Sequence, residues 1–361
     1  MAALFRRLDP DFERLHRVLW RQGEPDRVPF IELFADREIM EAVIGEPIPE
    51  AEKGDRRPRE AALLREIRFW YEAGYDYVEV GVAPNIPLRF LQAQDTAALN
   101  SGERGWISES EGPINSWQDF EAFPWPRPED TDYFNLEFVG RHLPEGMKII
   151  YVGGGQLEYV MWLMGYVPFA LALKDDPALM QAVNEKVGEL WAATFRAAAE
   201  AQGVGALWLG DDMGFKTGTM ISAADLRRYF FPWQKKLAAI AHARNLPFLL
   251  HSCGNLREVI DDLVEDVCID AKHSFEDAIQ PVTEAKQAYG DRVALLGGID
   301  VDFLCRHSEE EVRSRTRETI DACAPGGGWA LGTGNSVANY IPLRNYLAML
   351  DEGRKHGTYR S

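Results

Sequence analysis

The sequence lacks the cysteine pairs on which disulfide frameworks and zinc fingers depend. Its four cysteines, at positions 253, 268, 305 and 323, show no CxxC spacing, and a reducing compartment would keep them as thiols. Long apolar runs are also missing, because stretches such as PFLLH (247–251) are far too short to span a bilayer. Arginines and acids follow Met1 where a signal peptide would have its apolar segment. We therefore expect a cytoplasmic protein with no membrane contact.

Positive charge is scarce. Lysine and arginine number 39 against 57 aspartates and glutamates, which gives a formal net charge of -18. Such a chain is repelled at long range by phosphate backbones and by anionic membrane surfaces. The glycine fingerprint GxGxxG of dinucleotide-binding folds is absent as well. We expect a small-molecule substrate and no nucleic-acid partner.

What the sequence does contain is an alternation of short apolar runs with longer helical stretches. This alternation is typical of parallel strands joined by crossover helices. Eight strands close a barrel, and 361 residues suit one such barrel with insertions. The sequence thus predicts a single domain, residues 1–361, folded as a (β/α)8 TIM barrel. The candidate strands are 28–33, 75–81, 148–154, 206–212, 247–253, 267–274, 293–300 and 329–335.

Two regions fall outside the barrel repeat. The first 27 residues predict a helix followed by the turn GEPDR, which would close the bottom of the barrel or contact a second subunit. The interval between the second and third candidate strands is about twice the usual length, and its segment 112–132 is rich in proline, aromatic and acidic residues. We interpret it as a long packed insertion.

Polar residues follow most of the apolar runs. In a closed parallel barrel the C-terminal ends of all strands meet at one rim, where active sites of this fold lie. The residues expected to converge there are Glu79, Asp211, Asp212, His251, Cys253, His273, Asp300 and Asn335. Gly154, within the run 153–155, would let a flat ligand approach the backbone closely, although a tight turn explains the glycines equally well.

His251 and Cys253 are the strongest candidates for metal binding. They lie two residues apart at a strand end, so their side chains point to the same side and could bind zinc through nitrogen and sulfur. The alternative is a hydrogen-bonded rim histidine next to a packed thiol. A tight zinc site needs a third protein ligand. The candidates left open are Asp211, Asp212, Glu79 and His273.

The remaining candidates are assigned to catalysis and substrate binding. Asp211 could act as a general base, and His273 could transfer a proton or support His251 by a hydrogen bond. Because adjacent strand residues face opposite ways, only one of Asp211 and Asp212 should point into the barrel mouth, and the other would cap a helix. We expect substrate contacts from Glu79, Gly154, Asp212 and Asn335.

Four segments carry a family resemblance: LLHSCGN (249–255), DDMGFKTGTMIS (211–222), LLGGID (295–300) and LGTGN (331–335). Together they make the chain similar to the uroporphyrinogen decarboxylase superfamily over nearly its whole length. The H-x-C-G element looks more like the zinc-dependent, corrinoid-linked methyltransferases of that superfamily than like its decarboxylases. The resemblance implies zinc at His251 and Cys253, a corrinoid (cobalamin) partner protein, methyl transfer to a small thiol or similar acceptor, and a homodimer.

The chain departs from both branches of the superfamily. Decarboxylases carry an R-Q-A-G-R-Y element after the first strand, where this chain reads LFADRE (33–38) with only Arg37. Methyltransferases usually complete the zinc site with a cysteine after the last strand, where this chain has Thr333. Two other readings therefore stay open. One is a metal-independent decarboxylase (a lyase) acting on a tetrapyrrole or another carboxylate, and the other is a noncatalytic ligand-binding barrel.

Overall fold

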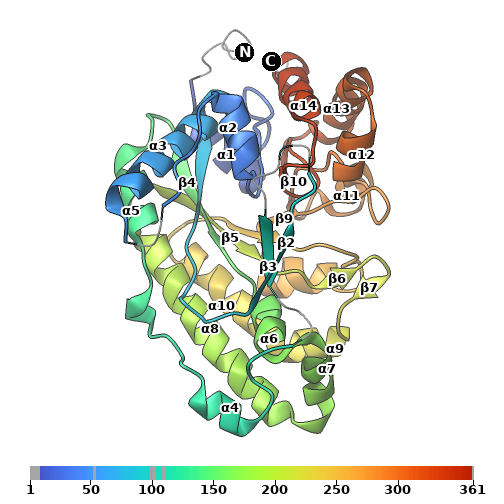
Figure 1. Cartoon of the computed structure of the whole chain (residues 1–361). Helices are drawn as coiled ribbons and strands as arrows, with labels where there is room; N and C mark the ends of the chain where they lie inside the picture. Colours follow the sequence, from blue (N-terminus) through green and yellow to red (C-terminus); the bar gives the residue numbers. More distant parts are fainter. Residues whose placement is uncertain (1–8, 52–53, 98, 100–102, 108–110, 360–361) are drawn as a thin grey trace.

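A curled parallel sheet forms the centre of the computed structural model, which describes residues 9–51, 54–97, 99, 103–107 and 111–359 (Figure 1). Its strands follow one another in chain order and every neighbouring pair is parallel. This is the predicted TIM-barrel architecture. The seven strands are β1 (Tyr77–Gly81), β4 (Lys148–Gly153), β5 (Val204–Gly210), β8 (Phe248–His251), β9 (Ala271–His273), β10 (Ala294–Leu296) and β11 (Trp329–Ala330).

The eighth barrel position is filled by segment 28–33, which does not form the regular strand that the sequence predicts. On one side the segment pairs with the chain at the end of β11, where the Ile31 amide donates to the Leu331 carbonyl at 2.9 Å. On the other side the Tyr77 hydroxyl contacts both the amide (2.7 Å) and the carbonyl (2.5 Å) of Glu32. A side chain therefore takes the place of the backbone ladder to β1, which corrects the prediction of eight regular strands.

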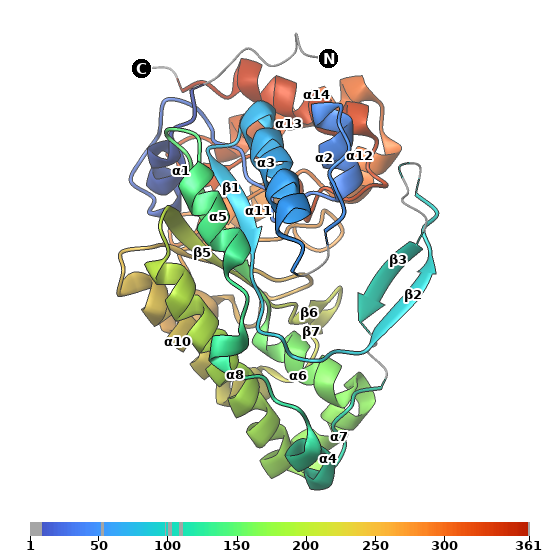
Figure 2. The same ribbon diagram turned by 60° about the vertical axis from the view of Figure 1, so that its left-hand side comes forward.

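Helices cover the outer face of the sheet (Figures 1 and 2). Among the described residues, no helix combines the length and the apolarity needed to cross a bilayer. The helices are α1 (Phe12–Leu19), α2 (Arg37–Ile44), α3 (Arg56–Ala73), α5 (Phe134–His142), α6 (Gln156–Met164), α7 (Tyr166–Asp175), α8 (Pro177–Glu200), α9 (Ala223–Asp225), α10 (Phe231–His242), α11 (Val282–Tyr289), α12 (Val301–Arg306), α13 (Glu309–Cys323) and α14 (Leu343–His356), with π-helical turns η2 (Leu226–Phe230) and η3 (Asp262–Val267).

The N-terminal helix α1 packs against the N-terminal ends of the strands. Its buried Arg14 binds Asp76, just before β1, at 2.7 Å, and also pairs with Asp26 at 2.5 Å. Phe12 packs so closely on Gly205 of β5 that a Cβ atom there would lie 2.6 Å from its ring. The helix thus closes the bottom of the barrel, one of the two roles expected from the sequence.

The long insertion after β1 is confirmed. It holds a hairpin of β2 (Phe90–Gln94) and β3 (Glu103–Ile107), followed by α4 (Trp117–Ala122) and η1 (Pro128–Asp130) before α5. Figure 2 shows this hairpin standing away from the body of the molecule. In the loop that follows β2, Asp95 accepts a hydrogen bond from the Asn339 side-chain amide at 2.7 Å. A second, two-residue hairpin, β6 (Gly214–Phe215) with β7 (Gly218–Thr219), follows β5.

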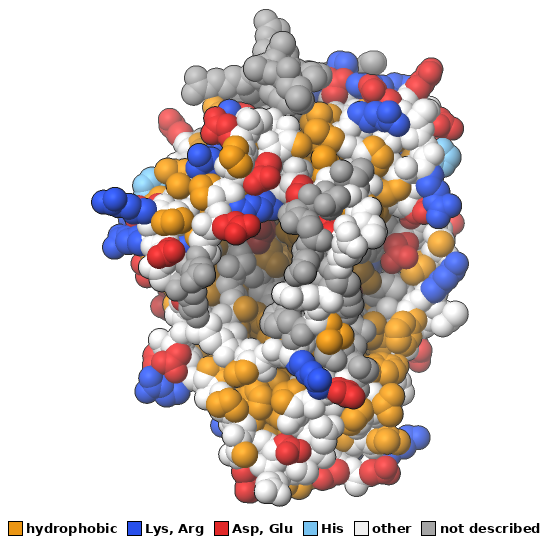
Figure 3. Space-filling model, in the orientation of Figure 1, with side chains coloured by type: hydrophobic (Ala, Val, Ile, Leu, Met, Phe, Trp, Pro, Cys, Tyr) orange, Lys and Arg blue, Asp and Glu red, His pale blue; other side chains and the backbone are white. Residues whose placement is uncertain are grey.

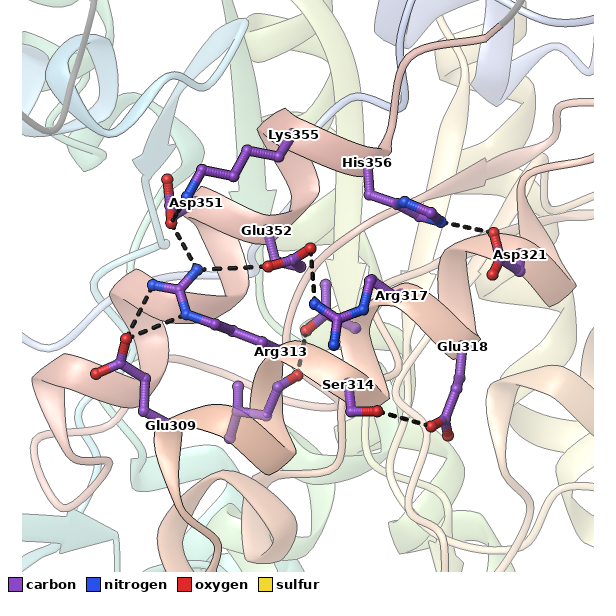
Figure 4. Close-up of polar contacts among 12 residues, drawn as sticks. Glu309, Arg313, Ser314, Arg317, Glu318, Asp321, Asp351, Glu352, Lys355 and His356 are labelled. Atoms are coloured by element: carbon purple, nitrogen blue, oxygen red, sulfur yellow. Dashed lines mark hydrogen bonds and ion pairs between the residues drawn. The ribbon is translucent and has the colours of Figure 1, made fainter.

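The last two long helices are joined by charged side chains, which we call the α13–α14 network (Figure 4). Arg313 reaches Glu309 at 2.9 Å and Asp351 at 2.5 Å, and Arg317 reaches Glu352 at 3.0 Å. Each contact joins opposite charges, so the network fastens α14 to α13, with Glu352 buried and Arg313 and Asp351 partly buried. Its members are Glu309, Arg313, Arg317, Asp321, Asp351, Glu352, Lys355 and His356.

Candidate active site

A cavity of about 510 Å³ opens at the C-terminal ends of the strands. In Figure 3 this face is hollowed near its centre, and hydrophobic side chains gather on the half of the molecule below the hollow. The position agrees with the rim expected for a barrel enzyme. The residues that line the cavity are Leu33, Phe34, Gly81, Val82, Ala83, Val152, Gly153, Gly154, Glu158, Tyr159, Trp191, Gly210, Asp212, His251, Cys253 and Asn335.

Three potential metal ligands meet in the cavity wall. Nε2 of His251 lies 3.5 Å from Sγ of Cys253 and 3.4 Å from Oδ1 of Asp212, and the three ligand atoms all lie within 4.8 Å of one another. The same Oδ1 accepts the Cys253 amide at 2.7 Å. His251 and Cys253 therefore point to the same side, as their spacing predicts, and Asp212 joins them from the end of β5.

The turn after Cys253 depends on the glycine of the H-x-C-G element. Gly254 has a φ of +85°, a conformation that residues with a Cβ atom rarely adopt. A Cβ atom at this position would also lie 2.2 Å from the backbone of Gly214 in β6. The glycine thus lets the chain turn sharply beneath the β6–β7 hairpin while Cys253 stays directed into the cavity.

His273 supports His251 from the neighbouring strand. The two histidines are paired residues of β8 and β9, and their Nδ1 atoms lie 2.8 Å apart. Burial and the neighbouring His251 lower the pKa of His273 well below its usual value, so a neutral His273 can accept the proton on Nδ1 of His251. This leaves Nε2 of His251 directed at Asp212 and Cys253. His273 does not line the cavity, which favours the supporting role over proton transfer.

The members of the Asp212–His251–Cys253 cluster shift one another's pKa values. Burial alone would lower the pKa of His251, but Asp212 and Cys253 raise it to about 10. Burial alone would likewise raise the pKa of Asp212, but His251 and Cys253 lower it. The favoured state is a protonated imidazole against a carboxylate. A divalent cation could replace that proton, because it supplies positive charge at the same atoms.

Asp211 points away from the cavity. Its Oδ1 accepts the amides of Leu157 (2.9 Å) and Glu158 (3.2 Å) in the first turn of α6, and its Oδ2 accepts from Gln234 at 2.7 Å. Burial raises the pKa of this carboxyl to about 7. The adjacent aspartates do face opposite ways, as expected. Asp211 therefore caps the N-terminus of α6. Its side chain does not line the cavity, which argues against the catalytic role predicted for it.

The predicted substrate contacts divide into two groups. Asn335 and Gly154 line the cavity, and the Asn335 amide donates to Sγ of Cys253 at 3.2 Å. A Cβ atom at Gly154 would lie 2.6 Å from the ring of Tyr159, so this glycine makes room for an aromatic side chain. Glu79 is not in the lining. The charge of Glu66 on α3 acts on it, and burial together with Glu66 raises its pKa to about 8.

The sequence analysis missed Glu158. This residue lies in the first turn of α6 and lines the cavity beside Asp212. Burial, followed by the charges of Asp212 and Asp211, raises its pKa well above the usual value. The signal in the sequence is the segment GGGQLEY, in which an acid follows a glycine-rich strand end at the start of a helix.

Thr333 stands where the resemblance to zinc-dependent methyltransferases leads us to expect a second cysteine, and its side chain binds a buried carboxyl instead. Its hydroxyl donates to Oε2 of Glu32 at 2.5 Å and its amide donates to Oε1 at 2.8 Å. Both residues are fully buried, and burial raises the pKa of Glu32 to about 8. Thr333 thus satisfies a carboxyl in the barrel core, and Asp212 is the third potential metal ligand beside His251 and Cys253.

A parallel barrel whose polar groups gather at the strand ends is the architecture of barrel enzymes. Residues 101–356 match the family model described as uroporphyrinogen decarboxylase (URO-D), and the chain therefore belongs to this family.

Solved and curated proteins agree with the assignment. A methyltransferase from Methanosarcina mazei superposes with a TM-score of 0.70 at 16% identity, covering 95% of this chain and 97% of the other, which shows the fold. A uroporphyrinogen decarboxylase of Geobacter sp. is 24% identical over 255 residues, 66% of this chain and 70% of the relative. One from Thioalkalivibrio sulfidiphilus is 34% identical over 76 residues, 21% of either chain.

Proposed function

We propose that the chain is a zinc-dependent methyltransferase that moves a methyl group from a corrinoid protein to a small thiol or similar acceptor. The observation that carries the proposal is the set of three ligand atoms, from Asp212, His251 and Cys253, that lie within 4.8 Å of one another in the wall of a cavity. The methyltransferase from Methanosarcina mazei has the same fold, which supports the choice of branch.

The donor set fits zinc. Imidazole nitrogen, thiolate sulfur and carboxylate oxygen are its usual protein ligands, and three of them leave a coordination position for a substrate, as in catalytic sites. Bound there, zinc would keep an acceptor thiol ionised and nucleophilic at neutral pH. The chain's own residues position these ligands. His273 orients His251 by a hydrogen bond, and the Asn335 amide donates to Sγ of Cys253. Val82 and Val152 contribute apolar side chains to the cavity wall.

Metal analysis of the purified protein tests the proposal. We expect about one zinc per chain, lost in His251→Ala and in Cys253→Ser. Cys268→Ser is the matched control, because Cys268 is exposed and free and its loss should leave the zinc content unchanged. Spectroscopy of a methylated corrinoid protein mixed with enzyme and thiol would then show demethylation. A folded protein without zinc would refute the proposal.

Decarboxylation is the second candidate, because both curated relatives carry that name. A tetrapyrrole with many carboxylates requires a basic clamp, and none of the described residues that line the cavity is a lysine or an arginine. Release of CO₂ from uroporphyrinogen would favour this candidate. Absence of zinc, of methyl transfer and of CO₂ release would leave a noncatalytic ligand-binding barrel.

A further inference from the structure

We infer that the cavity selects a small organic cation as the methyl acceptor, and that Glu158 is the residue that holds its positive group. The inference rests on the proposed transfer to a thiol and adds the charge class of that thiol. It makes Glu158, which the metal cluster does not use, a specificity-determining residue.

The charges of the cavity wall carry the argument. Its carboxyl groups are those of Glu158 and Asp212, and the described lining contains no lysine and no arginine. Asp212 is engaged with His251 and with the Cys253 amide. Glu158 has no ion pair with a lysine or an arginine among the described residues. It is partly buried beside Asp212, whose backbone amide hydrogen-bonds to it, and the charge of His251 acts on it from the same wall. A positive ligand group would stabilise the ionised carboxyl further, because burial disfavours its charge.

Two buried or partly buried basic side chains of the barrel are engaged outside the cavity lining. Lys272 is buried, and its Nζ donates to the Ser274 carbonyl at 2.7 Å and lies 4.3 Å from the centre of the Phe275 ring. Arg59 lines a separate cavity of about 320 Å³ and pairs with Asp132 at 2.7 Å. Neither of these two side chains is in the cavity lining, so a cationic ligand group could pair directly with Glu158.

The apolar part of the wall suits the same class of ligand. Phe34, Tyr159 and Trp191 all line the cavity, and aromatic ring faces attract ammonium groups, most strongly when water is excluded. An anionic thiol would instead meet the Glu158 carboxyl with no lysine or arginine in the described lining to offset it. Charge and ring chemistry thus favour an alkylammonium group at one end of the acceptor and a thiol at the other.

Three thiols with a two-carbon spacer test the inference by calorimetry on the zinc-loaded protein without a methyl donor. They are (2-mercaptoethyl)trimethylammonium, its neutral isostere 3,3-dimethylbutane-1-thiol, and 2-mercaptoethanesulfonate. The quaternary nitrogen cannot bind zinc, so charge is the variable. We expect the cation to bind at least about tenfold more tightly than the neutral thiol, the order of a charge-assisted contact. The anion should bind most weakly.

Glu158→Gln removes the charge and keeps the shape of the side chain. We expect the preference for the cation over the isostere to fall below about threefold, while the affinity for the isostere and the zinc content stay unchanged. Glu137→Gln is the matched control, because Glu137 lies on the outer helix α5 with its side chain 62% exposed. The control should keep the full preference. Equal or tighter binding of the sulfonate by wild-type protein would overturn the inference.

A metal-free measurement separates this inference from the proposed function. Wild-type protein treated with a chelator is titrated with choline and with 3,3-dimethylbutan-1-ol, which carry no thiol. A retained preference for choline that disappears in Glu158→Gln supports the charge assignment even if zinc proves absent and methyl transfer is refuted. Binding of zinc together with a preference for the neutral alcohol overturns the charge assignment and leaves the proposed function standing.

Discussion

The α13–α14 network and the cavity wall both concentrate acids, but only the network pairs them with lysine and arginine. Burial alone would raise the pKa of Asp351, yet Lys355 and Arg313 outweigh it and lower the value (Figure 4). In the cavity wall, burial and then the charges of Asp212 and Asp211 raise the pKa of Glu158 well above its usual value. Ion pairs between neighbouring helices indicate a role in packing and stability. Carboxyl groups without a lysine or arginine partner around a cavity indicate a functional site.

The largest effect is expected from removing Asp212, the acid of the proposed metal cluster in the cavity wall. We expect Asp212→Asn to weaken zinc binding by more than about 100-fold, because loss of a direct ligand should exceed the effect of losing a supporting hydrogen bond. Competition with a chromophoric chelator measures the affinity. The adjacent Asp211→Asn is the control: it should retain zinc and lose about 1–2 kcal/mol of stability through the weakened cap of α6. Unchanged zinc affinity in Asp212→Asn would exclude it as a ligand.

Glu32 gives the next largest effect, through pH. Its folded pKa, about 8, lies above the ordinary value of 4.5, so between these pH values the folded state binds more protons than the unfolded state. Its contribution to stability is complete below about pH 4.5 and is lost as pH rises through 8. We expect Glu32→Gln to flatten the fall in urea-unfolding free energy over this range. An identical slope in the variant would show that Glu32 ionises normally.

The barrel and the His251–Cys253 pair could be predicted from the sequence because both depend on local periodicity. Apolar runs fix the strands, and a two-residue spacing at a strand end fixes the side that the two groups share. The third ligand could not be chosen, since that choice depends on which of Asp211 and Asp212 faces inward after β5 ends. Glu158 was missed because the path of α6 over the rim is set by tertiary packing, including the Asp211 cap.

The eighth strand shows the same limit in the fold itself. Segment 28–33 has the apolar composition of a strand, but composition does not reveal that the Tyr77 hydroxyl would occupy the backbone groups of Glu32. Thr333 is similar, since a threonine in place of a metal-binding cysteine gives no hint of the buried carboxyl that it satisfies. Such contacts join residues far apart in the chain, and local patterns carry no record of them.

The smallest effect is expected where charges are already matched. Arg313→Ala removes contacts to Glu309, Asp351 and Glu352, but Lys355 still pairs with Asp351 and Arg317 with Glu352. No buried acid loses its last basic partner, so the loss should stay near the range of about 0–1 kcal/mol typical of exposed ion pairs. We therefore expect a loss of roughly 1 kcal/mol in urea unfolding, reduced further at high salt, with zinc content and thiol binding unchanged. A change in either binding property would mean that the network is coupled to the cavity. Because α14 packs behind the barrel strands and contributes no residue to the cavity lining, charge pairing there should matter for stability alone.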